Sequence, residues 1–573
     1  MTSVAASEPE GGRKWANLCV LGGFCVLAFL FFGLRILIEP GHQYVGVFDD
    51  PQIFIWSFGW WLHAIEHGVN PFVTHAIWAP SGVNLAWATT VPALAVAFAP
   101  LTALIGPVAS YDVAVVLMPA LSAWTAYLLC RHLVGRFWPA AVGGYLFGFS
   151  SYELGHMLGE AHLTSVFAIP LIALVIVRGF EGELRPRGLI VRLGPLLALQ
   201  IYLSTEIALT ATISLVLALV LALILVPEGR RRVIGLLLPL AGAYAVAALL
   251  AAPLLYYVLT DVRLSGFTPP QNYTGDLLNF LIPTHLEAAG AGWAHSIARH
   301  FRGNTTEQSV YLGLPVLAIV ALFAFRTWRT PRSRFLLAAL ALAGYLSLGP
   351  SLEVAGHRLI PLPTLLGHET LTVPGVGTKV VPLFDNVLPV RFALFASLAS
   401  SVIVAIWMST ARSRLAAVML PALAVVLLVP NPGAGVWATS YSVPPFFASA
   451  AFRNCLSPNE IVLPEPVGSG GQATLWQAVD GFRFRMAGGR LATSPPSKFL
   501  HPPEIAVVSI GLPMARNQVS LLRNYFRVKG VSAVIVDKRH LSTWAPLLDR
   551  IATPHTVGGV VYYRVAGSAA PCP

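Results

Sequence analysis

The sequence predicts an all-α polytopic membrane protein with about eleven transmembrane helices and a small C-terminal extracytoplasmic α/β domain. Hydrophobic residues make up 56% of the 573-residue chain and charged residues only 11%, whereas soluble domains carry roughly 25% charged residues. Long apolar runs recur up to residue 430, and after it the runs shorten to strand length. This composition excludes a soluble enzyme. The net charge of +11 comes from arginines in short loops, which argues against a nucleic-acid partner.

The first apolar run, residues 16–38, follows the basic pair Arg13 and Lys14. It is too long for a signal-peptide core and no small-residue cleavage pattern follows it. We therefore expect a retained first helix, with residues 1–15 in the cytoplasm. Ten more spans are predicted over residues 108–130, 137–150, 164–178, 188–203, 207–226, 233–258, 309–325, 335–349, 389–408 and 414–430.

The arginines predict the topology, because positive residues concentrate in cytoplasmic loops. With the N-terminus inside, eleven spans place five arginine-bearing loops inside. Their arginines are Arg131 and Arg136; Arg178, Arg185, Arg187 and Arg192; Arg230, Arg231 and Arg232; Arg326, Arg329, Arg332 and Arg334; and Arg412 and Arg414. The N-terminus is thus predicted in the cytoplasm, and residues 16–430 form the membrane domain.

Segment 39–107 contains no lysine or arginine and is predicted as the first outer loop. A span over its apolar run 88–105 would turn every arginine-bearing loop outward, so we expect that run to be interfacial or re-entrant. A helix is predicted over 51–67, lying along the interface. Its tryptophans, Trp56, Trp60 and Trp61, are interpreted as membrane anchors.

Residues 431–573 are predicted to form the outer α/β domain. The stretch "EIVLPEP" has strand length, and residues 528–565 indicate a strand, a helix and a strand. Cys455 and Cys572 both fall in this domain, where oxidation permits a disulfide. The sequence shows no internal repeat, P-loop, dinucleotide-binding fingerprint or zinc-ligand spacing.

Asp49 and Asp50 are adjacent carboxylates at the start of the predicted interfacial helix. Asp50 precedes Pro51, which is typical of a helix start, and capping by Asp50 would account for one aspartate. It leaves Asp49 unexplained. Ionisable residues beside a membrane are costly unless they are paired, solvated or functional. Capping alone and a functional acidic pair both stay open.

Further polar residues mark the predicted outer face. In "YELGHMLGEAHLTS", a helix over 156–162 would put His156 and Glu160 on one face, with His162 nearby. This set suits cavity lining better than a metal site, because it lacks the zinc-protease spacing. Arg391, at the outer start of a span, suits either a snorkelling role or bidentate phosphate binding. The other outer polar candidates are Glu206, His285 and Glu307.

The chain resembles the GT-C superfamily of integral-membrane glycosyltransferases over about residues 15–430. The resemblance rests on a first span followed by a long outer loop with an acidic pair, and on the order of several motifs. These are "NPFVTHAIWAPSGVNLAW", "GEAHLTS", "STEIALTA", "GDLLNFLIP", "EQSVYLGLP" and "LPVRF". They resemble a bacterial branch of the superfamily, which implies residence in the bacterial cytoplasmic membrane.

This resemblance implies a sugar donor linked to a polyprenyl phosphate, such as decaprenyl or undecaprenyl phosphate. It implies an acceptor glycan, glycolipid or protein on the outer face. An acidic residue of the first outer loop acts as base in the superfamily, which maps onto Asp49 or Asp50. Some members use a divalent cation such as Mg²⁺ or Mn²⁺, and here Asp49 and Asp50 would be its ligands, if any.

The residue types fit this chemistry. An inverting transfer needs one carboxylate to take the proton of the acceptor hydroxyl. The phosphate leaving group needs cationic stabilisation more than protonation, which Arg391 and the outer histidines could supply. The main alternative is a transporter or a flippase of a lipid-linked glycan. A transporter would need polar or broken segments at mid-membrane, often in repeated halves, and here the polar residues gather on one face. A structural cell-envelope protein is a further alternative.

Overall fold

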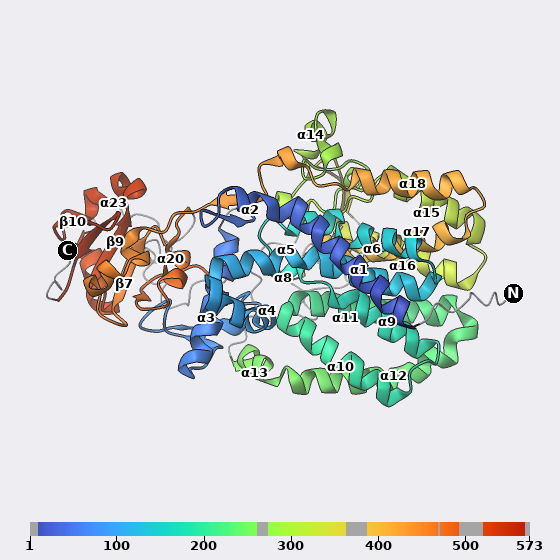
Figure 1. Ribbon diagram of the computed structural model, residues 1–573, viewed down its shortest axis with the longest axis horizontal. Helices are drawn as coiled ribbons and strands as arrows, with labels where there is room; N and C mark the ends of the chain where they lie inside the picture. Colours follow the sequence, from blue (N-terminus) through green and yellow to red (C-terminus); the bar gives the residue numbers. More distant parts are fainter. Residues whose placement is uncertain are drawn as a thin grey trace. The chain divides into compact units, whose positions relative to one another are not determined.

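The protein is described by a computed structural model that covers residues 10–47, 49–260, 273–361, 387–467, 470–491 and 519–567. The chain divides into two compact units, which are described separately (Figure 1). Unit 1 comprises Met1–Leu34, Val115–Ala252 and Arg263–Trp437. Unit 2 comprises Arg35–Ala114, Pro253–Val262 and Ala438–Pro573.

Unit 1 is a bundle of helices. They are α1 (Glu10–Ala28), the part of α5 (Ala99–Val134) after residue 114, α6 (Phe137–Gly148), α7 (Ser151–His156), α8 (Ala161–Thr164), α9 (Ala168–Phe180), α10 (Pro186–Leu203), α11 (Thr205–Leu225), α12 (Arg230–Leu250), α14 (Trp293–Ala298), α15 (Leu314–Thr327), α16 (Pro331–Ser347), α17 (Ala393–Thr410) and α18 (Arg414–Leu427). A hairpin of β4 (Ser351–Val354) and β5 (His357–Pro361) completes the unit. Most of α2 (Leu34–Ile38), which continues from α1, belongs to unit 2.

The protein is a multi-pass membrane protein. Within the described residues, six helices are long and apolar enough to cross a membrane: Trp15–Ile38, Ala99–Val134, Ala161–Phe180, Thr205–Leu225, Pro227–Leu250 and Pro389–Thr410. The other predicted spans coincide with α6, α10, α15, α16 and α18, which are helical but shorter or more polar. The count of eleven spans and the orientation stay predictions.

Small residues let α5 and α6 approach closely inside unit 1. A Cβ added to Gly144 would lie 2.6 Å from the carbonyl oxygen of Ala123, and one added to Gly148 would lie 2.4 Å from the Ala123 nitrogen. Membrane helices use small residues in this way, because lipid provides little hydrophobic drive for helix association. The apolar core of the unit is formed mainly by side chains of α9, α10, α12 and α17 with their neighbours.

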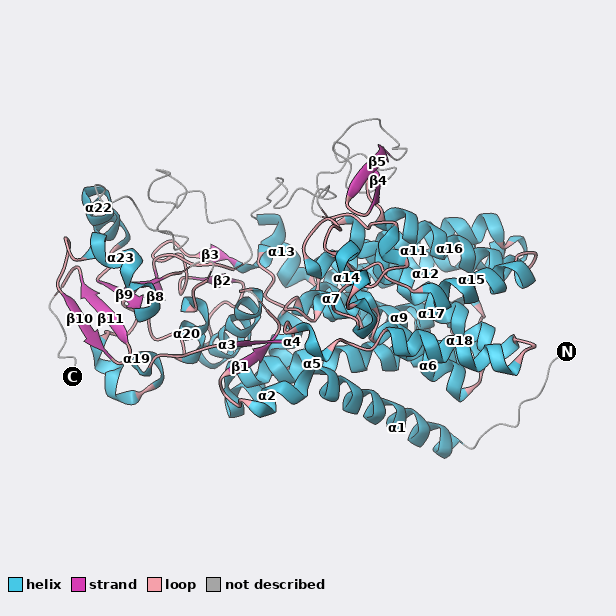
Figure 2. Cartoon of the chain, turned by 90° about the horizontal axis from the view of Figure 1, so that it is seen from above, coloured by secondary structure: helices cyan, strands magenta, loops and turns pink. Residues whose placement is uncertain are grey.

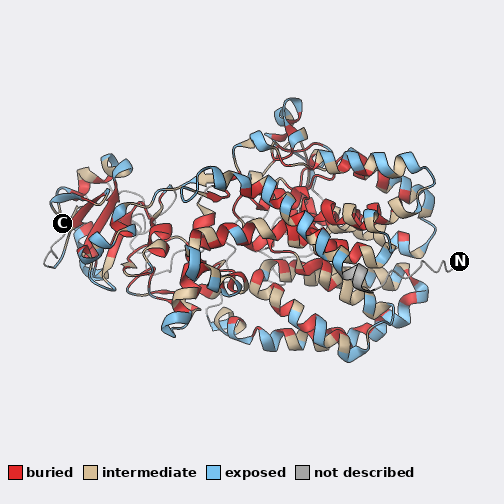
Figure 3. Cartoon of the chain, viewed as in Figure 1, coloured by how far each residue is buried: buried red, intermediate tan, exposed pale blue. Residues whose placement is uncertain are grey.

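Unit 2 contains a five-stranded sheet of order β10-β11-β9-β7-β8, drawn in magenta in Figure 2. The strands are β7 (Ile461–Glu465), β8 (Arg485–Met486), β9 (Ala533–Asp537), β10 (Pro554–Val557) and β11 (Val560–Arg564). Strand β7 runs parallel to β8 and β9, with Val462 opposite Ala533, while β11 runs antiparallel to β9 and β10. Nearly every residue of β7, β9 and β11 is buried (Figure 3), which accounts for their apolar sequences.

Helices α22 (Val519–Lys529) and α23 (Leu541–Leu548) pack on this sheet through Leu522, Phe526 and Trp544. The strand and helix predicted within 528–565 lie where the sequence placed them. The predicted last strand is instead the hairpin β10–β11, turned at Gly558 and Gly559, which both have positive φ. Cys455 is buried in this unit. Cys455 is disulfide-bonded, and because Cys572 lies outside the described residues, the pairing of the two stays a prediction.

The first outer loop and the C-terminal segment share unit 2, whereas the sequence assigned them to different domains. Strand β1 (Gln43–Val45) pairs with β6 (Ala438–Ser440), so that Tyr44 lies opposite Thr439. The unit also contains β2 (Val73–Thr74), β3 (Val83–Asn84), α4 (Pro92–Ala97), α13 (Ala252–Thr260), α19 (Pro445–Ala448) and α20 (Ala473–Val479). The run predicted as interfacial, 88–105, contains α4 and the start of α5, which breaks at Gly106 (φ 83°).

The membrane-anchor interpretation of the tryptophans is wrong. Helix α3 (Asp50–His67) forms as predicted, but Trp56, Trp60 and Trp61 are 0%, 5% and 6% exposed. Trp56 and Trp60 stack on each other, and each contacts Phe482 edge-on. These side chains therefore form the core of unit 2 rather than facing lipid.

Candidate active site

The aspartate pair, Asp49 and Asp50, lies at the start of α3 in unit 2. The predicted capping by Asp50 is wrong: Asp50 is the first helical residue, and Asp49 occupies the N-cap position. The Asp49 side chain accepts no capping hydrogen bond from the helix. Its Oδ2 accepts instead from the backbone N–H of Gly470, at 3.1 Å. Helix capping thus leaves both carboxylates unexplained.

Arg490 joins the two carboxylates. Its Nη1 lies 2.6 Å from Asp49 Oδ2, and its Nη2 lies 3.6 Å from Asp50 Oδ1. Asp50 is 38% exposed, against 19% for Asp49, so Asp50 is the more accessible carboxylate. Sequence reasoning missed this arginine because 441 residues separate it from Asp49. The one local signal is a pair of glycines, Gly488 and Gly489, after a short strand.

Gln477 ties α3 to the segment that supplies Arg490. Its Oε1 accepts from Trp56 Nε1 at 2.7 Å, and its Nε2 donates to the carbonyls of Ala76 (2.7 Å) and Phe484 (3.0 Å). Gln52 adds a bond to the carbonyl of Gly471. Because Gln477 is fully buried, its amide fixes three chain segments in a place where water cannot replace it.

Replacing Gln477 by leucine should lower the free energy of unfolding by about 2–5 kcal/mol. The substitution leaves Trp56 Nε1 and the Phe484 carbonyl without their partner, at roughly 1–3 kcal/mol each, while the Ala76 carbonyl keeps its hydrogen bond from Met486 N–H. Thermal unfolding of the purified protein in detergent measures the effect. Gln43→Leu is the control, because Gln43 makes an exposed hydrogen bond to Glu39. Equal melting temperatures for the two variants would show that the Gln477 bonds contribute nothing.

The Arg391 cluster consists of Arg391, Glu206, Glu307 and His156, all in unit 1. Arg391 Nη1 pairs with Glu206 Oε2, and Nη2 lies 2.9 Å from Glu307 Oε1. His156 Nε2 is 3.8 Å from Glu307 Oε2, while its Nδ1 lies 2.7 Å from the carbonyl oxygen of Tyr152. Four separate segments of the chain bring these predicted residues together.

Burial shapes the ionisation of this cluster. It lowers the pKa of His156 to about 4, so this histidine is neutral at pH 7. Burial alone would raise the pKa of Glu307, but the charge of Arg391 and its hydrogen bond outweigh burial and hold that pKa below its usual range. Arg391 is therefore engaged by two carboxylates, which is inconsistent with simple snorkelling. The charges of Arg391, Glu206 and Glu307 sum to −1.

The predicted helix over 156–162 is wrong. Helix α7 ends at His156, and Glu160 is the N-cap of α8, so His156 and Glu160 do not share a helical face. Gly159, with φ 137°, makes the turn and was the available signal. Glu160 instead lies 3.5 Å from His162 Nδ1, and both interact electrostatically with Arg391. His285 contacts the ring of His295 rather than the Arg391 cluster.

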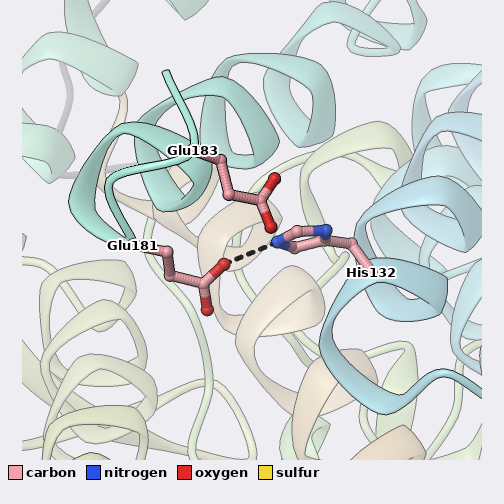
Figure 4. Close-up of side chains that lie close together, drawn as sticks. All are labelled: His132, Glu181 and Glu183. Atoms are coloured by element: carbon pink, nitrogen blue, oxygen red, sulfur yellow. Dashed lines mark hydrogen bonds and ion pairs between the residues drawn. The ribbon is translucent and has the colours of Figure 1, made fainter. Parts of the chain in front are cut away.

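Among the described residues, one group brings three possible metal ligands within 4.8 Å of one another: His132, Glu181 and Glu183 (Figure 4). His132 Nε2 lies 2.7 Å from Glu181 Oε2, and Arg178 holds Glu183 at 2.8 Å. Ion pairing explains this exposed group, whose loops are predicted to be cytoplasmic. Within the described chain the aspartate pair offers two carboxylates, and no third histidine, cysteine or acidic side chain joins them in such a group.

Residues 19–374 match a family described as a domain of unknown function, DUF6311, and the chain belongs to that family. A search of curated proteins finds no match to the chain.

Solved structures show the fold. The chain is similar to the arabinofuranosyltransferase AftD from Mycobacteria, with a TM-score of 0.53 and 14% identity, over 97% of this chain and 40% of that one. It is similar to the oligosaccharyltransferase of Archaeoglobus fulgidus in complex with zinc and sulfate, with a TM-score of 0.51 and 12% identity, over 95% of this chain and 73% of that one. The oligosaccharyltransferase AglB from Archaeoglobus fulgidus, in complex with an inhibitory peptide and a dolichol-phosphate, gives a TM-score of 0.51 at 12% identity, over 97% of this chain and 74% of that one.

These similarities confirm the GT-C-like fold that the sequence predicted. The chain spans about two fifths of the length of the arabinofuranosyltransferase. At such identities the likeness concerns fold, and function depends on the site itself.

Proposed function

We propose that the protein is an inverting glycosyltransferase that moves a sugar from a polyprenyl-phosphate donor to a glycan, glycolipid or protein acceptor. One observation carries the proposal: two adjacent carboxylates, bridged by an arginine, stand at the start of a buried helix in a GT-C-like membrane protein. Because the Asp49 side chain makes no capping hydrogen bond to the helix, the pair can serve as a general base.

The proposed transfer needs a carboxylate base for the acceptor and a cationic group for the leaving phosphate. Asp49 or Asp50 takes the proton of the acceptor hydroxyl as that oxygen attacks the anomeric carbon of the sugar. The bond from that carbon to the phosphate oxygen breaks, and the polyprenyl phosphate leaves with the electron pair. The developing negative charge on the phosphate favours a guanidinium, for which Arg391 is the candidate.

The similar structures support the choice of donor class. One is named an arabinofuranosyltransferase, and another contains a dolichol-phosphate, which is a polyprenyl-type lipid. The arginine-bearing loops support a cytoplasmic N-terminus in the bacterial inner membrane, with the aspartate pair on the outer face. The Arg391 cluster and the pair Glu160–His162 are proposed to contact substrate.

A donor assay on the purified protein tests the proposal. Radiolabelled polyprenyl-phosphate sugars are supplied as a panel with an envelope glycan extract, and sugar transfer and hydrolysis are followed. We expect one donor to lose its sugar. Translocation of a lipid-linked glycan in proteoliposomes, without sugar release from any donor, would contradict the proposal and indicate a flippase. Adding EDTA to the reaction tests whether transfer needs a divalent cation such as Mg²⁺ or Mn²⁺, to which we assign no step.

Transfer should also fail in acid. Burial and the neighbouring Asp49 raise the pKa of Asp50, and Arg490 opposes them only in part, so the pKa lies above the usual range of an aspartate. A base must be deprotonated, so activity is present above this pKa and is lost as the pH falls through it. The pH dependence of kcat/KM measures it. An acid limb that is absent in wild type down to pH 4 would contradict the role of Asp50 as base.

A further inference from the structure

The aspartate pair has no basic residue near it in sequence. Segment 39–107 lacks lysine and arginine, so a compensating arginine or lysine of this chain can come only from outside that segment. In the described structure Arg490, from the C-terminal segment, provides it. The guanidinium of Arg490 contacts both carboxylates. Neither helix capping nor solvation at the surface would require an arginine between the two aspartates.

The backbone on both sides of this contact is fixed. Met486 and Gly488 exchange hydrogen bonds with the first outer loop: Met486 N–H donates to Ala76, while Ala79 and Trp78 donate to the carbonyls of Met486 and Gly488 at 2.9 and 3.3 Å. Gly489 is packed so closely on the loop that an added Cβ would lie 2.1 Å from Ile77 Cγ1. Arg490 therefore starts from an anchored backbone, one residue beyond this contact.

The second anchor is on Asp49. Its Oδ2 accepts both from Arg490 and from Gly470 N–H, which belong to the two ends of the segment 470–490. Two donors to Oδ2 fix the orientation of the Asp49 carboxylate. The other oxygen, Oδ1, takes no part in these two hydrogen bonds. Orientation of this kind matters in catalysis, because misplacing a reacting group by about 1 Å costs about 10²-fold in rate.

We propose that Arg490 is a positioning residue that holds Asp49 and Asp50 in one arrangement toward the acceptor hydroxyl. The C-terminal segment thereby completes the catalytic site that the first outer loop begins. This inference rests on the proposed glycosyl transfer and names a residue on which that transfer depends. Arg490 acts through the aspartates, not as a base.

Arg490→Met, Arg490→Lys and the control Arg485→Met test the inference. Arg485 lies in the adjoining strand, and its side chain donates to the carbonyl of Asn459. We expect Arg490→Met to lower kcat 10- to 100-fold, with the KM for donor changed less than threefold. Arg490→Lys should recover at least half of the loss on a logarithmic scale, and Arg485→Met should behave like wild type. In an Asp49→Asn, Asp50→Asn background, Arg490→Met should cause no further loss.

Carbodiimide labelling of carboxylates, followed by mass spectrometry, gives a readout that needs no activity. Labelling of Asp49 should rise several-fold in Arg490→Met and stay at the wild-type level in Arg485→Met. Unchanged labelling would overturn the inference, even if wild type transfers sugar. Raised labelling in a protein inactive on every donor would support the bridge and refute the glycosyl transfer. A higher KM for the donor with an unchanged kcat would also overturn positioning, because it would mean that Arg490 binds the donor.

Discussion

Replacing both Asp49 and Asp50 by asparagine should lower the rate of sugar transfer at least 100-fold while the protein stays folded. A positioned general base contributes about 10²–10⁴-fold, and an amide cannot accept the proton. Asparagine keeps the size of the side chain and an oxygen that can accept from Gly470 N–H. Initial rates with the donor found active measure the effect, beside the two single variants.

Asp480→Asn is the matched control. Asp480 lies in the same unit and pairs with Arg483 at 3.2 Å, so its replacement also removes one carboxylate from an ion pair. We expect this variant to transfer sugar at nearly the wild-type rate. If the double variant kept normal activity, neither aspartate would be the base. If Asp480→Asn lost as much activity, the effect would belong to the folding of unit 2.

Replacing Arg391 by methionine should lower the free energy of unfolding by about 3–5 kcal/mol. Removing one partner of a buried ion pair leaves uncompensated charge, and the cost falls in this range. Here two partners are left, Glu206 and Glu307. Arg391 is buried and Glu307 is 3% exposed, so water can compensate them only in part. Thermal unfolding in detergent gives the measurement.

The triple variant Arg391→Met, Glu206→Gln, Glu307→Gln separates charge from packing. Because it contains none of the three charges, it should regain most of the stability lost in Arg391→Met. A triple variant as unstable as the single one would mean that packing of the guanidinium, not its charge, explains the loss. If the restored protein still fails to transfer sugar, the cluster has a functional role beyond stability.

The helices were predictable because an apolar run is a local pattern. Residues 207–226 and 389–408 were expected as spans, and α11 and α17 occupy them. The buried strand "VSAVIVDK" was predictable on the same ground. The sequence predicted only that Glu206, Glu307 and Arg391 lie on the same side of the membrane, not that they contact one another. Their ion pairs depend on side-chain directions at three separate turns, which periodicity does not contain.

The environment of α3 was not predictable, because it depends on residues more than 400 positions away. Tryptophan is a common membrane anchor, so the local sequence around Trp56 favours that role. Only its contact with Gln477, 421 residues later, shows that Trp56 is a core residue. Arg490 shares this property. The break after His156 was predictable in principle, since Gly159 interrupts the supposed helix. The site could therefore be predicted only in part from the sequence, because its main contacts join residues that lie far apart in the chain.

The most direct measurement is the anomeric configuration of the product, read by NMR after transfer from a polyprenyl-phosphate sugar of known configuration. Direct attack by an acceptor hydroxyl that Asp49 or Asp50 deprotonates inverts the anomeric carbon, so a β-linked donor gives an α-linked product. A product with the donor's configuration would require a covalent glycosyl intermediate or another mechanism, and would contradict a single displacement with an aspartate base.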